Sequence, residues 1–191
     1  MDELSVFSKE NDESDKKKEA RSKLEDKLYD ECHETKMVEV GNGFVTYCRH
    51  FKYLGSWISH NLRDDHDVDM RIAAAGRSMG ALNHFFGRNE VNIYSKYLIF
   101  MAIPINLLLW GCESWALRVD LSRKLERFVN RKIRKIININ LWHVMKHRIT
   151  VEEMRNRFNN IPSVQTMIDI RTMQFLGKIV RDQCPYHQGN Y

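Results

Sequence analysis

The clearest pattern in the chain is the recurrence of apolar residues at helical spacing after residue 64. One stripe places six apolar side chains on a single helix face, namely Val68, Ile72, Ala75, Met79, Leu82 and Phe86. A second predicted helix, residues 121–138, does the same with Leu121, Leu125, Phe128, Val129, Ile133 and Ile136. After Pro162, a last helix aligns Val164, Ile168, Phe175 and Ile179. These periods predict a mainly α fold.

Residues 91–109 are apolar nearly all round, which predicts the most deeply buried helix, kinked or interrupted at Pro104. The apolar run 97–110 is too short for a bilayer and contains Pro104 and Asn106. We therefore expect a core helix here and no membrane partner.

The segment before these helices has a β-like pattern. The tripeptide Gly41-Asn42-Gly43 separates two β-prone runs and supplies the positive φ angles of a hairpin turn, and residues 51–58 form a further extended stretch. The pattern predicts a small antiparallel β-hairpin sheet of two or three strands. Such a sheet is too small to be stable alone, so we expect it to pack on the helices.

Three helix starts carry capping signals. Asp64 and Asp65 stand before the first stripe, and Asp120 stands before the helix at residue 121. Thr150 with Glu153 forms a capping box for a short helix that ends near Phe158.

Charge divides the chain into segments. Residues 1–36 hold twelve acidic and eight basic side chains, so the formal net charge of +5 separates into −4 and +9. We interpret residues 1–35 as a charged, flexible, disordered tail, 36–60 as the hairpin, 61–182 as the helical domain and 183–191 as a tail. The N-terminus lacks a secretory pattern and the four cysteines form no CxxC pair, which indicates an intracellular protein of the nucleus or cytoplasm.

The predicted helix 121–138 has a cationic face opposite its apolar one. This basic ridge spans about a third of the circumference and consists of Arg123, Lys124, Arg127, Arg131, Arg134 and Lys135. Glu126 is the sole acid in the sequence between Leu121 and Asn140. Solvated helix faces normally mix charges of both signs, so the ridge favours contact with a polyanion, nucleic acid above all.

Other motifs have simpler explanations than chemistry. Helix-start acids account for Asp64, Asp65, Asp67 and Asp69 without a bound metal. His143 and His147 have the spacing of a helical zinc pair, but Val144 stands where HExxH has its glutamate. The sequence also lacks a Gly-rich phosphate loop and a nucleophile elbow. We expect no metal, no cofactor and no catalytic residue.

Five short motifs follow one another between residues 51 and 182: FKYLGSWIS, DVDMRI, LLLWGCESWAL, KLERFVNRKIRKIININ and FLGKIVRD. In this order and spacing they resemble the C-terminal region of non-LTR (LINE-like) retrotransposon reverse transcriptases. The chain departs from that pattern at Trp110, where the family often has Tyr, and at Lys178, where the usual residue is His.

The resemblance implies roles for two sets of residues. Lys52, Tyr53, Leu54 and Gly55 correspond to the turn of the last palm hairpin, which supports the primer strand. The helices that follow correspond to the thumb, and the basic ridge would face the backbone of an RNA/DNA or DNA duplex through its phosphates.

The resemblance also implies that catalysis lies elsewhere. In the family, an aromatic-x-Asp-Asp turn that holds two metal ions precedes the YLG segment, whereas the Asp-Asp of this chain follows it, at Asp64 and Asp65. We therefore expect an RNA-directed DNA polymerase fragment that does not polymerise alone.

Two functions of different class follow from these patterns. The first is a thumb-like module that binds nucleic acid through the backbone. The alternative is a degenerate retroelement product that acts only as a helical protein–protein interaction module and self-associates through the apolar surface that would have faced the palm. A further interpretation, in which another chain supplies the palm, depends only on the YLG segment.

Overall fold

The computed structural model describes Lys23, Lys27 and residues 38–41, 43–45 and 48–183. The chain divides into two compact units, Met1–Arg63 and Asp64–Tyr191. The predicted tails at 1–35 and 183–191 lie almost wholly outside the described residues, as do Cys32 and Cys184.

Within its described residues, the first unit contains two antiparallel hairpins. Strands β1 (Val38–Val40) and β2 (Gly43–Val45) pair with Val38 opposite Val45, and Gly41 in the turn has a φ of 59°. Strands β3 (His50–Tyr53) and β4 (Ser56–Ser59) pair with Tyr53 opposite Ser56. The predicted hairpin at Gly41 is confirmed. The stretch 51–58 is a second hairpin and not one extended segment, because Leu54 and Gly55 turn the chain with positive φ angles of 47° and 91°.

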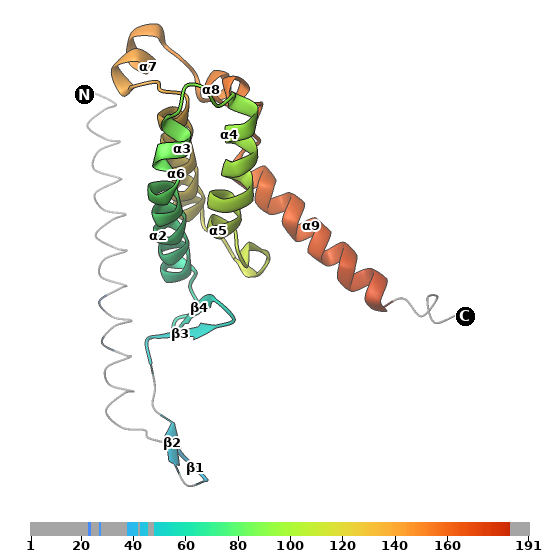
Figure 1. The fold of residues 1–191 in the computed structure, drawn as a ribbon. Helices are drawn as coiled ribbons and strands as arrows, with labels where there is room; N and C mark the ends of the chain where they lie inside the picture. Colours follow the sequence, from blue (N-terminus) through green and yellow to red (C-terminus); the bar gives the residue numbers. More distant parts are fainter. Residues whose placement is uncertain (1–22, 24–26, 28–37, 42, 46–47, 184–191) are drawn as a thin grey trace, which may run out of the picture. The chain divides into compact units, whose positions relative to one another are not determined.

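The second unit is helical (Figure 1). Helix α2 (Asp65–Ala81) gives way to the short α3 (Asn83–Gly87) at Leu82, so the predicted stripe continues across a break. Helix α4 (Ile93–Phe100) continues as a π-helical turn, η1 (Met101–Ile105), and then as α5 (Asn106–Leu108). The predicted interruption at Pro104 is confirmed, because proline lies inside that π-helical turn.

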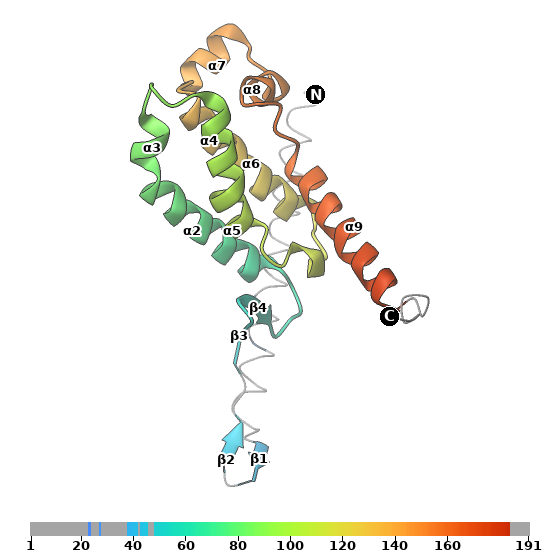
Figure 2. The ribbon, with the colours of Figure 1, turned by 45° about the vertical axis from the view of Figure 1, so that its right-hand side comes forward.

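After a 3-10 turn, η2 (Cys112–Ser114), the chain forms the longer helix α6 (Val119–Ile136). Two short helices, α7 (Leu141–His147) and α8 (Val151–Arg157), lead to α9 (Val164–Gln183). Figures 1 and 2 both show α7 and α8 together at one end of the helical unit, with α9 extending from its side.

The core of the second unit lies between α2, the α4–α5 segment, α6 and the start of α9. A chain of edge-to-face rings crosses it, with Phe86 6.4 Å from Phe100 and Phe100 5.5 Å from Phe158. All six apolar residues predicted for α6 are buried, as are the first two of α9. The mainly helical fold, preceded by small antiparallel hairpins, is confirmed.

Burial differs from the sequence prediction in two places. The 91–109 segment is not buried all round, since Tyr94, Leu98 and Ile103 are exposed on its outer side. On α9, Phe175 is exposed although Val164 and Ile168 are buried, because the helix extends past the body that it packs against. Among the described residues, no helix combines the length and apolar character needed to cross a membrane.

Candidate nucleic-acid interface

Helix α6 is oriented by its apolar residues. The buried side chains of Leu125, Val129 and Ile133 hold one side against the core, which directs the opposite side to solvent. The six residues of the basic ridge therefore lie on the outer surface, with Arg134 half-buried and the other five exposed. The structure brings together all six residues that the sequence placed there.

The ridge is not uniform in its ion pairs. Lys124 forms an ion pair with Asp69 of α2, which neutralises its charge. Near the start of α6, Arg118 pairs with Asp65 at 2.6 Å and with Asp120 at 3.0 Å, and these contacts raise its pKa. The other five ridge residues have no acidic partner in the part of the chain that the structure describes. We call these the five unpaired cations: Arg123, Arg127, Arg131, Arg134 and Lys135.

Glu126, the one acid of α6 beyond its first turn, is turned away from the ridge. The carboxylate of Glu126 accepts a hydrogen bond from the guanidinium of Arg155 on α8. Its second oxygen accepts from the backbone N–H of Val164, at the start of α9, at 3.0 Å. Glu126 is thus used to join three helices and does not neutralise the five unpaired cations.

Lys132 extends the positive surface at the edge of the ridge, a contribution that the helical pattern alone did not show. Its Nζ lies 5.2 Å from the ring centroid of Phe128. Partial burial lowers the pKa of Lys132, and repulsion from Arg131 and Lys135 lowers it further. The cations at this end of α6 are therefore crowded enough to disfavour one another.

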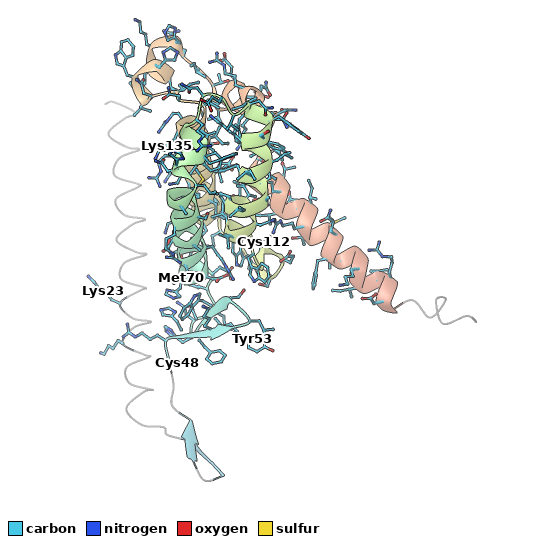
Figure 3. All side chains as sticks on the ribbon, in the orientation of Figure 1. Lys23, Cys48, Tyr53, Met70, Cys112 and Lys135 are labelled. Carbon is cyan, nitrogen blue, oxygen red and sulfur yellow. The ribbon has the colours of Figure 1, made fainter. Side chains whose placement is uncertain are left out.

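A hollow of about 390 Å³ lies where α6 ends and α7 begins. Lys135, labelled in Figure 3, lies toward this end of the helical unit. We call it the basic hollow, and its lining consists of Arg131, Lys132, Arg134, Lys135, Asn138, Ile139, Asn140 and Leu141. The chain turns here because Asn138 adopts a φ of 55° and Asn140 caps α7 by accepting from His143 N–H at 2.7 Å. The sequence signal for this break was the Asn-Ile-Asn run after Ile137.

The other predicted site residues belong to the first unit. Lys52, Tyr53, Leu54 and Gly55 form the β3–β4 turn, with Tyr53 (labelled in Figure 3) and Leu54 exposed. The Nζ of Lys52 lies 5.9 Å from the ring centroid of Trp57. These four residues therefore form one tight turn whose side chains face solvent.

The acidic residues at the start of α2 bind protein groups. Asp64 stands at the N-cap position, but its side chain accepts from Ala116 N–H at 2.9 Å and caps no amide of α2. Burial raises the pKa of Asp64, partly offset by that hydrogen bond. Asp67 accepts from the indole of Trp115, and Asp65 and Asp69 form the ion pairs above. The four acids thus connect α2 to the segment 115–124.

The other predicted caps have mixed outcomes. Asp120 caps no helix, because α6 begins at Val119 and Asp120 instead pairs with Arg118, which lowers the pKa of Asp120. Thr150 caps α8 by accepting from Glu153 N–H at 3.1 Å, as predicted, whereas the Glu153 carboxylate pairs with Arg157.

The ring centroids of His143 and His147 lie 4.3 Å apart on α7. Within the described ranges, no three side chains of the metal-ligating types lie together.

Comparisons of the chain with family models, with curated proteins and with solved structures find no match.

Proposed function

We propose that this chain is a nucleic-acid-binding module whose helix α6 lies along the phosphate backbone of a duplex. One observation carries the proposal: five cations share one face of α6 and have no acidic partner among the described residues, while the two acids of the helix, Asp120 and Glu126, bind Arg118 and Arg155. Crowded cations repel one another, and a polyanion relieves that repulsion.

The dimensions of the face fit a duplex. Arg123 and Lys135 are separated by about 18 Å along the helix axis, at 1.5 Å per residue. A duplex of that length presents about five phosphates on each strand. Five contacts would make the logarithm of the binding constant fall with the logarithm of salt concentration at a slope of about −4.5 for B-form DNA. Because backbone contacts carry no base information, we expect weak sequence preference.

The ordered motifs that resemble LINE-like reverse transcriptases support a more specific version. In this version the helical unit acts as a thumb on an RNA/DNA or DNA primer-template, and the Lys52–Gly55 turn supports the primer. We propose that the chain does not add nucleotides alone and that it works in the nucleus or cytoplasm, where such duplexes occur. A primer-extension assay with the purified chain tests the first point, and incorporation that survives removal of contaminating polymerases would refute it.

The central experiment is a fluorescence-anisotropy titration of the full chain with a labelled RNA/DNA duplex at several salt concentrations. The test variant combines Arg123→Ala, Arg127→Ala, Arg131→Ala and Arg134→Ala. The control variant removes four exposed cations outside α6, through Arg77→Ala, Arg88→Ala, Lys178→Ala and Arg181→Ala. Both variants lose the same formal charge, so they separate the position of the cations from the net charge.

We expect steep salt dependence in the wild type and the control, and a shallow slope with weak binding in the test variant. Equal binding by both variants would mean that α6 has no special role. Absence of salt-dependent binding in the wild type would refute the proposed function altogether.

A second candidate function is self-association through an apolar surface. The last half of α9 exposes Met173, Leu176 and Val180 along one side, and Phe175 on another. Exposed apolar patches of this kind mark protein contacts. Sedimentation velocity of the wild type and of a Met173→Ser, Leu176→Ser, Val180→Ser variant tests it, since only a dimer held by α9 would dissociate in the variant.

A further inference from the structure

The surface of α7 joins aromatic and apolar side chains to the basic hollow. None of the residues of α7 is buried. Leu141, Trp142, Met145 and Lys146 fall within about 140° of the helix circumference, at 100° per residue. Leu141, Trp142 and Met145 are all more than half exposed. We call these four residues the α7 surface, and Leu141 also lines the basic hollow.

The stretch of sequence that holds this surface carries charge of one sign. In the sequence, residues 127–151 contain seven Lys or Arg side chains and no Asp or Glu. The Nζ of Lys146 lies 4.6 Å from the ring centroid of Trp142, so a cation borders the exposed indole. An exposed apolar surface beside the basic hollow favours a partner that is both anionic and able to stack.

We infer that the α7 surface binds a single-stranded extension of the nucleic acid, with a base stacked on Trp142 and the adjoining phosphates held in the basic hollow by Arg131, Arg134 and Lys135. The inference rests on the proposed function, because the duplex on α6 would deliver the strand to this end of the helix. Every base has a stacking face, so the site would accept any sequence. Unpaired bases are required, since paired bases are stacked on one another.

The seven residues of α7 argue against a membrane surface as the partner. Amphipathic helices that lie in a bilayer interface are typically much longer, and α7 continues into the αL residue Arg148, with a φ of 49°. Anionic lipid remains an outcome of the test, because it would also meet a basic surface with an exposed Trp.

The experiment measures the affinity of the full chain for two DNA duplexes, one blunt and one with a short oligothymidine extension. The test variant is Trp142→Ala. Trp110→Ala is the matched control, since Trp110 is 56% exposed, Trp142 is 63% exposed, and Trp110 does not line the basic hollow. Trp142→Phe keeps an aromatic face. Circular-dichroism melting checks that each variant is folded.

We expect the extension to strengthen wild-type binding and Trp142→Ala to abolish that gain, a loss of roughly 5- to 150-fold for one stacked base. Trp142→Phe and Trp110→Ala should keep most of the gain. The inference is overturned if Trp142→Ala responds to the extension as the wild type does, or if the extension gives no gain while salt-steep duplex binding persists.

In the second of those outcomes the proposed function stands without the single-strand site. If neither duplex binds in a salt-dependent way, the proposed function fails and this inference with it. A parallel sedimentation assay with phosphatidylserine vesicles covers the lipid alternative. Loss of vesicle binding in Trp142→Ala, with no change in the response to the extension, would assign the α7 surface to lipid.

Discussion

The indole Nε1 of Trp115 donates a hydrogen bond to Oδ2 of Asp67 at 2.9 Å, joining the first turn of α2 to the segment that leads into α6. Asp67 is 2% exposed, and its other oxygen lies 3.4 Å from Nε of Arg71. A buried carboxylate held in this way fixes the relative position of two helices, and one of them carries the basic ridge. The contact links two of the short motifs, DVDMRI and LLLWGCESWAL.

Replacing Asp67 should therefore be costly. Asp67→Ala leaves the Trp115 N–H without its acceptor and removes the carboxylate beside Arg71, so we expect a loss of about 3 kcal/mol in the free energy of unfolding. Trp115→Phe removes only the hydrogen bond and some packing, and should cost roughly 1.5–3 kcal/mol. Urea unfolding followed by circular dichroism measures both, and strictly additive effects in the double variant would show that the two residues are not coupled.

Glu126 should stabilise the fold mainly by holding α8 and α9 against α6. Glu126→Ala removes the acceptor for Arg155, whose guanidinium is largely buried and whose pKa burial already lowers. We expect a loss of about 2–3 kcal/mol in unfolding free energy. Hydrogen exchange should become faster in residues 151–168 and remain unchanged in α2. Uniform acceleration across α2 as well would mean that Glu126 acts on the whole core and not on the α8–α9 junction.

Part of this structure could be predicted from the sequence. The buried and exposed sides of α6 follow directly from helical periodicity, and all six predicted apolar residues are buried. The turn at Gly41 follows from residues that tolerate positive φ angles. Local rules suffice where the determining residues are close in sequence.

The remaining features depend on contacts between distant residues. No local pattern reveals that Lys124 meets Asp69, 55 positions earlier, or that Asp64 binds Ala116 and does not cap α2. Phe175 follows the apolar period of α9, yet it is exposed because the helix is longer than the body beside it. The sequence pattern does not predict helix α7. This helix has only seven residues and none of them is buried, so it lacks the apolar stripe that marks a helix.

The β3–β4 turn offers a test of backbone strain. Leu54 is 81% exposed and has a φ of 47°, a conformation that costs an ordinary L-residue roughly 1 kcal/mol and that Asn tolerates better. Leu54→Asn should relieve this strain and make the hairpin more stable. Amide hydrogen exchange in residues 50–59 should therefore become slower. The opposite result, faster exchange, would mean that the Leu54 side chain stabilises the turn through contacts that offset the strain.

Cys112 should be nearly inert at neutral pH. Burial raises the pKa of its thiol to about 11, and the nearby Glu113 adds to the shift. The thiolate is the reactive form, and at pH 8 it would make up about one part in a thousand. Iodoacetamide labelling read by peptide mass spectrometry should modify the exposed Cys48 long before Cys112. Comparable rates would show that the Cys112 region opens readily.

The ion pairs on α6 predict unequal contributions from neighbouring cations. Arg127 has no acidic partner among the described residues, whereas Lys124 is paired with Asp69. If α6 binds phosphates, Arg127→Ala should reduce the steepness of the salt slope by about 0.9, the value for one lost contact. Lys124→Ala should change it much less, because phosphate must first displace a carboxylate. Anisotropy titrations at several salt concentrations give both values.

Removing the acid should reverse this difference. Asp69→Asn frees Lys124, so we expect tighter binding and a steeper slope, and in that background Lys124→Ala should cost as much as Arg127→Ala. Asp182→Asn, at the end of α9, makes the same charge change away from the ridge and is the control. The ion pair itself is solvent-exposed and contributes little to folding, so stability should change by less than about 1 kcal/mol. Equal gains from Asp69→Asn and Asp182→Asn would attribute the effect to net charge, and the assignment of individual phosphate contacts to α6 would then be wrong.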